Sequence, residues 1–164
     1  GFYDQAFIEA TEVQKAVRDG RVPREEEDQH FERLARMVIS RDERILSLVH
    51  EYLSLDDILR VRRRMLGTGL IGGKAVGMLL ARAMLRKHTP RFRDLLEEHD
   101  SFFVGSDVFY TYLVQNGIWW VRKRQRDTED FYESATRARR LIITGVFPEY
   151  IVKQMEEMLD YFGQ

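Results

Sequence analysis

A cluster of glycines in the middle of the chain sets the outline of any fold that this sequence can adopt. Four glycines fall within seven residues, at positions 67–73 (GTGLIGG). Glycine is unfavourable inside helices and strands, so these residues predict a loop. The chain is therefore expected to have two parts, one before and one after this loop.

The residues before the loop have the spacing of amphipathic helices. Apolar side chains recur three and four residues apart in four successive stretches, at about residues 2–19, 24–38, 45–53 and 54–65. Gly20 predicts the end of the first helix, Pro23 the start of the second and Ser54 the start of the fourth. Residues 1–64 are thus predicted to form a helical N-terminal extension.

The residues after the loop predict more helices and few strands. Helices are expected at about residues 75–87, 90–99, 107–115, 127–144 and 149–161. The first of these is apolar nearly all round, which predicts a central position. Residues 101–105 (SFFVG) are the best strand candidate, and residues 118–121 (IWWV) predict either a second short strand or an aromatic anchor.

So few strands lead to a choice between two architectures. One or two strands cannot satisfy their own backbone hydrogen bonds, so the fold is either almost wholly helical or lacks part of a sheet. The predicted fold class is α+β and predominantly α-helical.

Composition excludes several classes of protein. The 164 residues include no cysteine, which excludes thiol catalysis, redox CxxC chemistry and thiolate zinc sites. The most apolar stretch, residues 71–81, is interrupted by Lys74 and is far shorter than the about 20 residues that span a bilayer. With no basic leader before an apolar N-terminal segment, a soluble cytoplasmic protein without a membrane partner is expected.

The net charge of −1 conceals an uneven distribution of charged residues. Residues 58–93 contain no acid but ten basic side chains, and residues 108–126 contain no acid but Arg122, Lys123, Arg124 and Arg126. These segments either attract an anion or form solvated helix faces whose partners lie across the fold. A general nucleic-acid binder of the strongly basic kind is disfavoured by the net charge.

The glycine loop matches no established phosphate-binding pattern completely. Gly67, Gly69 and Gly72 have the spacing of the dinucleotide-binding fingerprint, but residues 60–66 predict a helix where that fingerprint needs a strand. The P-loop pattern fails because Thr68 replaces its first glycine and Ala75 replaces its Ser or Thr.

A simpler phosphate site remains at Gly72, Gly73 and Lys74. These residues directly precede an apolar helix, so free N–H groups and one ammonium meet at a helix N-terminus. Lys74 is the only charged residue in positions 65–81. The alternative is a tight turn from which Lys74 reaches solvent along its aliphatic stem.

Residues 71–78 (IGGKAVGM) resemble a glycine-glycine-lysine segment of the phosphoenolpyruvate synthase and pyruvate, phosphate dikinase family. In that family the segment belongs to an N-terminal nucleotide-binding domain with an ATP-grasp fold. Residues 101–109 look like the family's next strand and helix, and residues 145–150 (GVFPEY) look like the segment before its arginine-containing strand. The resemblance covers about residues 65–164 and implies a partial ATP-grasp domain, truncated at its C-terminus.

The resemblance also implies a function. Gly72 and Gly73 match the ATP-binding loop and Lys74 matches the lysine that contacts nucleotide phosphates, although Ala75 replaces the usual next glycine. ATP with Mg²⁺ would donate a phosphoryl group in a reaction that links pyruvate and phosphoenolpyruvate through a phosphohistidine. The chain is expected to be an ATP-binding fragment of such a phosphotransferase, inactive alone, whose partners are ATP and the remainder of the parent polypeptide.

No catalytic or metal-binding residue is assigned from the sequence. The family's arginine strand, its acidic metal ligands and its phosphohistidine domain have no counterpart among these residues. None of the four histidines lies in a segment like the phosphorylated one: His30, His50, His88 and His99.

A second hypothesis is a helical module that binds an anionic partner, either a nucleic acid or a protein. The arginines of residues 60–64 and of residues 122–126 would make the contacts, and Trp119 and Trp120 could stack on bases. Residues 1–64 could instead regulate or dimerise the parent, so the sequence leaves homo-oligomerisation open.

Overall fold

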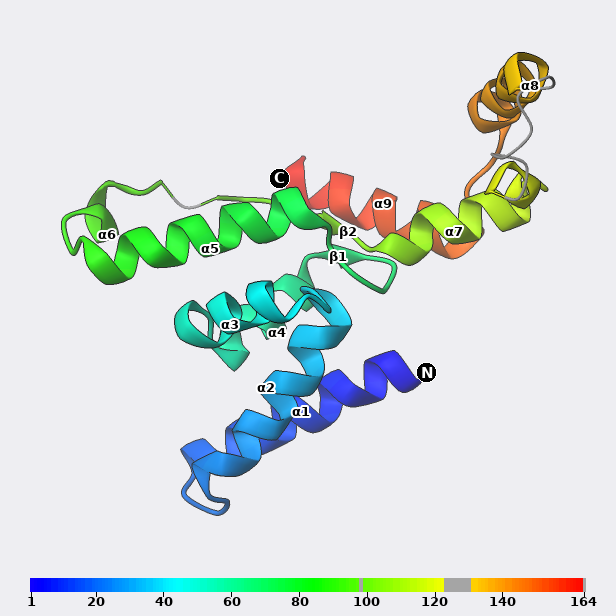
Figure 1. The fold of residues 1–164 in the computed structure, drawn as a ribbon. Helices are drawn as coiled ribbons and strands as arrows, with labels where there is room; N and C mark the ends of the chain where they lie inside the picture. The colour runs from blue at the N-terminus through cyan, green and yellow to red at the C-terminus, as the bar shows by residue number, and fades with distance from the viewer. Residues whose placement is uncertain (98, 123–130, 164) are drawn as a thin grey trace. The chain divides into compact units, whose positions relative to one another are not determined.

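The computed structural model describes residues 1–97, 99–122 and 131–163 (Figure 1). Helices account for 73% of these residues and strands for 3%, which confirms the predominantly α-helical α+β fold class. The chain forms two compact units, Gly1–Gly105 and Ser106–Gln164.

The first unit begins with the four helices that the sequence predicts. They are α1 (Phe2–Arg18), α2 (Arg24–Val38), α3 (Glu43–Tyr52) and α4 (Leu55–Arg63). Ser54 caps α4, as predicted. Pro23, which is expected to open the second helix, lies directly before its first residue, in the N-cap position of α2. The apolar faces meet in a core whose largest fully buried side chains are Leu34, Val38, Leu46, Val49 and Ile58.

A small parallel sheet follows α4 (Figure 1). Strand β1 (Met65–Leu66) pairs with β2 (Phe103–Val104), with Met65 opposite Phe103 and Leu66 opposite Val104. The prediction that the fourth helix continues to Met65 is therefore wrong, whereas the predicted strand at 101–105 is confirmed at its centre. Helices α5 (Gly73–His88) and α6 (Phe92–Leu95) lie between the strands in sequence.

Helix α5 is less buried than its composition predicts. Only Val76 and Leu80 are buried, and Leu85 is exposed. The prediction of a central helix is wrong within this unit, because α5 packs on the core along one side and leaves Met78, Leu79 and Met84 only partly buried.

One hydrophobic core joins residues from both sides of the domain boundary predicted between residues 64 and 65. Val38 and Ile58 belong to the same cluster as Ile71, Val76 and Phe103. The division into compact units falls later, after Gly105. That residues 65–164 form the nucleotide-binding part stays a prediction.

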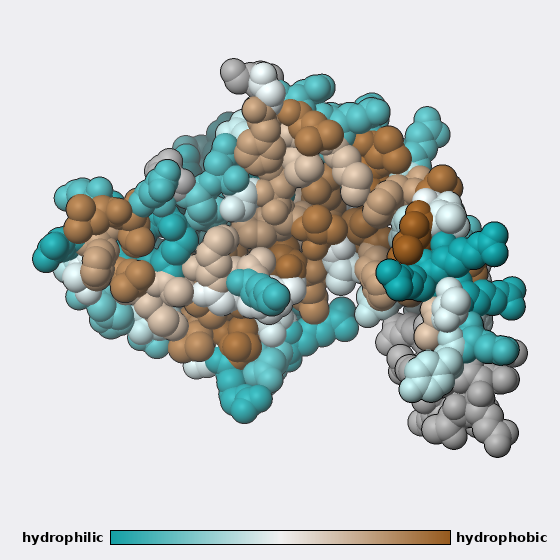
Figure 2. Space-filling model, turned by 90° about the horizontal axis from the view of Figure 1, so that it is seen from above, coloured by the Kyte–Doolittle hydropathy of each residue, from teal (hydrophilic) through white to brown (hydrophobic). Residues whose placement is uncertain are grey.

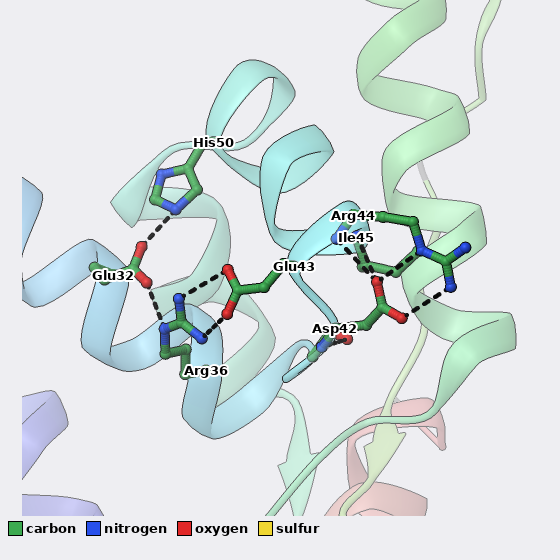
Figure 3. A network of polar contacts seen from close by, with 8 residues as sticks. Glu32, Arg36, Asp42, Glu43, Arg44, Ile45 and His50 are labelled. Carbon is green, nitrogen blue, oxygen red and sulfur yellow. Dashed lines mark hydrogen bonds and ion pairs between the residues drawn. The ribbon is translucent and has the colours of Figure 1, made fainter.

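Polar contacts on the surface connect α2 to α3 (Figure 3). The Arg36 guanidinium donates to both carboxylate oxygens of Glu43, at 2.7 and 3.1 Å, and also pairs with Glu32. Glu32 in turn contacts His50 on α3. The Arg36 hydrogen bond lowers the pKa of the Glu43 carboxyl group. Since all these side chains are partly exposed, the network orients α3 more than it stabilises the fold.

The second unit contains α7 (Ser106–Gln115), the 3₁₀ helix η1 (Trp119–Arg122), α8 (Phe131–Thr144) and α9 (Glu149–Phe162). Residues 119–122 are helical, so the alternative of a second short strand is wrong. The completely buried residue of this segment is Ile118, whereas Trp119 is 40% exposed. Residues 127–130 of the predicted eighth helix lie outside the described residues.

Asn116 connects α7 to the turn between α8 and α9. Its side-chain amide donates to the Val146 carbonyl oxygen at 3.0 Å, and its Oδ1 accepts from the Val146 N–H at 2.9 Å. The Tyr112 hydroxyl donates to the Ile142 carbonyl oxygen at 2.7 Å. Asn116, at the predicted helix end, thus also holds α7 to the turn between α8 and α9 through hydrogen bonds.

Candidate functional site

The glycine loop leads from the end of β1 to the start of α5. Gly67, Gly69 and Gly72 have φ angles of 68°, 88° and 87°, a region that residues with a Cβ rarely adopt. Strand β1 precedes the loop, so the prediction of a helix directly before it, on which the dinucleotide-binding pattern was rejected, is wrong. The order β1, glycine loop, α5 and parallel β2 is the context in which α/β proteins bind phosphate groups.

Three neighbouring elements hold the loop in place. The Ile71 N–H donates to the Val38 carbonyl oxygen at the end of α2, at 2.9 Å. The Tyr3 hydroxyl of α1 donates to the Gly69 carbonyl oxygen at 3.2 Å. After β2, the Gly105 N–H donates to the Leu66 carbonyl oxygen at 2.8 Å. The predicted extension is therefore part of the support for the loop.

Sequence reasoning missed Tyr3 and Val38 as supports of the loop. Val38 belongs to the apolar stripe of its predicted helix, whereas Tyr3 stands beside Phe2 in the first helix and carries no signal of a contact with the loop. The contact to Val38 uses only its backbone, which carries no sequence signal.

At the N-terminus of α5, where the predicted site residues Gly72, Gly73 and Lys74 lie, backbone N–H groups have no partner among the described residues. The first hydrogen bond of the helix runs from the Val76 N–H to the Gly72 carbonyl oxygen, at 3.1 Å, and no side chain caps the helix. Among the described residues, the N–H groups of Gly73, Lys74 and Ala75 find no acceptor. The three predicted site residues are all exposed.

Lys74 lies where a positive charge opposes the helix dipole. Each of the other eight α-helices in the described ranges has an acidic residue in its first turn, whereas α5 has none. A cation at this end costs roughly 0.3–1 kcal/mol. The Lys74 side chain makes no hydrogen bond or ion pair with the described part of the chain. An anion would therefore be stabilised here by the ammonium, the dipole and the N–H groups together.

The Mg²⁺ implied by the family resemblance has no ligand set in this part of the chain. Within residues 1–97, 99–122 and 131–163, no group of three or more acidic, histidine or cysteine side chains is placed to hold a metal ion. His50 contacts Glu32, and the Nε2 atom of His88 lies 2.9 Å from the Tyr52 hydroxyl. These two histidines thus have ordinary structural partners.

The arginines of residues 60–64 point to different neighbours. Arg62 pairs with Asp4 at 2.8 Å, and its guanidinium lies over the ring of Tyr3. Arg60 pairs with Asp56 and Arg64 with Asp100, both at 2.7 Å. This agrees with the prediction that some of these arginines have partners within the fold.

The second predicted basic run cannot be placed. Lys123, Arg124 and Arg126 lie outside the described residues, as does the side chain of Arg122. Nearby, Arg137 lies over the Trp120 ring and Trp119 makes an edge contact with Tyr110. Both tryptophans therefore have aromatic or cationic neighbours within the second unit.

Comparison of this chain with protein-family models, with curated proteins and with solved structures finds no match. The resemblance to the phosphoenolpyruvate synthase and pyruvate, phosphate dikinase family stays a prediction. Among the described helices, none combines the length and the apolar character that crossing a membrane requires.

Proposed function

We propose that the glycine loop and the N-terminus of α5 bind the phosphate groups of ATP. The observation that carries this proposal is the meeting of three unpaired N–H groups with the exposed Lys74 at a helix end that lacks an acidic residue. Phosphate oxygens accept hydrogen bonds from such N–H groups and pair with an ammonium. Gly72 and Gly73 allow the ligand to approach the backbone closely.

The chain would then be the first part of an ATP-grasp domain in a phosphotransferase like phosphoenolpyruvate synthase or pyruvate, phosphate dikinase. In such a reaction Lys74 and the loop N–H groups position the nucleotide and stabilise the charge of the transferring phosphoryl group. The ATP-bound Mg²⁺ would take its protein ligands from other parts of the parent protein.

Two features support a role for the remainder of the parent polypeptide as a partner. A sheet of two strands is only marginally stable, and Val104 on β2 is 52% exposed. Hydrophobic atoms also reach the surface on the face shown in Figure 2. In the second unit the exposed apolar side chains include Phe109, Val114, Ile143, Val146, Leu159 and Phe162. Strands from the rest of the parent polypeptide would extend the sheet, and its apolar side chains would cover the exposed ones of the second unit. We do not expect the chain to catalyse phosphoryl transfer without them.

Titration of ATP into the protein tests the phosphate site. We expect Lys74→Ala to weaken ATP binding about tenfold or more, because a hydrogen bond to a charged group contributes about 1.5–3 kcal/mol. Lys15→Ala is the matched control, since Lys15 is an exposed lysine on α1. Equal affinities of the wild type and Lys74→Ala would contradict the proposal.

A second experiment uses the full-length parent protein. Lys74→Ala should there abolish ATP-dependent phosphorylation, whereas unaltered phosphorylation would contradict the role of this lysine. Binding to single-stranded nucleic acid that falls steeply with salt and ignores Lys74→Ala would instead favour the hypothesis of an anion-binding module.

A further inference from the structure

The first unit contains a cavity of about 360 Å³ between α4, the second half of α5 and residues 99–103. One wall is apolar and includes Ile58, Val61, Leu79 and Phe103. The remaining lining is mostly cationic or able to become so. It consists chiefly of Arg60, Arg63, Arg64, Arg82, Arg86 and His99.

Among the described residues, the acidic groups of the cavity are fewer than its arginines. The lining within residues 1–97, 99–122 and 131–163 includes two carboxylates, those of Asp57 and Asp100. Asp57 accepts from the Ser54 N–H in the capping box of α4 and lies 3.6 Å from the Arg60 guanidinium, and Asp100 pairs with Arg64.

Three of the lining arginines have no carboxylate partner among the described residues. Arg60 pairs with Asp56, but Arg63, Arg82 and Arg86 form no ion pair with the described residues. Several like charges around one small cavity repel one another and create a positive potential inside it.

Arg82 carries a polar group that the described residues leave unsatisfied. Its Nε–H is buried and has no hydrogen-bond partner among them, while its other end donates to the Glu97 carbonyl oxygen. A buried N–H without an acceptor is unfavourable, so an acceptor placed in the cavity would be bound favourably.

The pKa of His99 is affected by burial and by the arginines of the cavity. Desolvation lowers the pKa of its imidazole, and the charges of Arg82 and Arg86 lower it further, while Asp100 acts in the opposite direction. A bound anion would oppose the effect of the arginines and raise this pKa.

We infer that this cavity binds a small molecule that carries one or two phosphate groups. A guanidinium donates two parallel hydrogen bonds to phosphate oxygens, and the arginines come from two helices that face the same space. The volume lies at the small end of the roughly 300–1,000 Å³ typical of ligand pockets, and the apolar wall fits a compact organic body.

This site is distinct from the proposed ATP site. Lys74 lies in the first turn of α5, and Arg82 lies roughly 12 Å further along the helix axis. The two sites also use different cations, so a variant at one is informative about the other.

The test is titration of inorganic pyrophosphate into the protein at constant ionic strength, by calorimetry and by NMR of the histidine side chains. We expect the double substitution Arg63→Gln and Arg86→Gln to weaken binding at least tenfold. Both side chains are exposed, so the double variant should still fold. Arg18→Gln on α1 removes an exposed arginine elsewhere and should leave the affinity unchanged.

The NMR signals of the histidines distinguish binding in the cavity from binding at the glycine loop. With the His99 resonance assigned by His99→Gln, pyrophosphate should raise the pKa of His99 in the wild type and in Lys74→Ala. Pyrophosphate binding that disappears in Lys74→Ala and leaves the His99 signal unmoved would place the ligand at the loop and overturn the inference. Unchanged affinity in the double variant would overturn it too, as would binding of single-stranded DNA but not of pyrophosphate.

Discussion

Gly105 lies so close to Thr68 that no side chain fits at position 105. A Cβ atom there would lie 2.0 Å from the Thr68 carbonyl oxygen and 2.8 Å from the Met65 Cε atom. The residue after β2 thus packs directly on the backbone of the glycine loop. The loop is consequently held by the sheet as well as by the helices before it.

Gly105→Ala should destabilise the protein by about 1–3 kcal/mol or more, because the backbone of the loop has to move. Urea unfolding measures the change in the free energy of unfolding. Gly77→Ala is the matched control, since open space surrounds Gly77 within α5 and alanine should stabilise the helix by about 0.5–1 kcal/mol. Equal stabilities of the two variants would show that the close approach is absent.

Gly72→Ala should destabilise the protein, whereas Gly73→Ala should not. Gly72 has φ 87° and ψ 154°, a region that is essentially restricted to glycine, so alanine should cost about 1–3 kcal/mol. Gly73 is the first residue of α5 and has open space around it, so alanine should be neutral or stabilise by up to about 1 kcal/mol. Thermal unfolding of both variants tests this, and a lower stability of Gly73→Ala would contradict it.

Asn116→Ala should loosen the second unit. The substitution removes both hydrogen bonds between Asn116 and Val146. Because Val146 is 65% exposed, water can replace the lost acceptor, so the cost should be that of ordinary hydrogen bonds, about 0.5–1.5 kcal/mol. Hydrogen exchange of the Val146 amide should become faster. Gln115→Ala removes only a long contact of 3.4 Å to the same carbonyl, so it serves as the control. Unchanged exchange in Asn116→Ala would refute the role of this side chain.

Asp4 should make stability depend on pH in the acidic range. The hydrogen bond from Arg62 lowers the pKa of the Asp4 carboxyl group below its ordinary value of 3.8. The ionised form is thus favoured in the folded state. The stabilising contribution is present above about pH 4 and is lost as the pH falls through the lowered pKa.

Comparison of the wild type with Asp4→Asn isolates this contribution. At pH 7 the variant should be less stable by about 0.2–1 kcal/mol, as is usual for an exposed ion pair. At pH 2 the difference should shrink, because the wild-type carboxyl group is then mostly protonated too. Asp28→Asn is the control, since Asp28 is exposed and pairs with no residue in the described ranges. A difference that stays constant between pH 7 and pH 2 would contradict the effect of Arg62.

The helices and the glycine loop could be predicted because their signals are local. Ser54, Pro23 and the apolar repeats of α1 to α4 act within a few residues of one another. The same holds for Gly72, Gly73 and Lys74, whose shared position at the start of α5 follows from adjacency in the sequence.

Strand β1 could not be predicted, because it is defined by a distant partner. Met65 continues the apolar spacing of Ile58 and Val61, so it has the appearance of one more helical turn. Only its pairing with Phe103 makes it a strand. A strand of two residues is too short for an alternating pattern to appear.

The arginine-lined cavity escaped prediction for a related reason. Arg63 is adjacent in sequence to Arg62, yet Arg62 pairs with Asp4 while Arg63 lines the cavity with Arg82 and Arg86. Neighbours in a helical sequence point about 100° apart, so a run of arginines is not one surface.

The hydrogen bond from Tyr3 to Gly69 couples the first helix to the loop that we propose as the nucleotide site. Docking of α1 and occupancy of the loop then become linked equilibria, since each favours the same loop conformation. A ligand of the loop should protect the amides of α1 from exchange without touching them. A change at the very start of the chain would in turn alter the affinity of a site about 70 residues away in sequence.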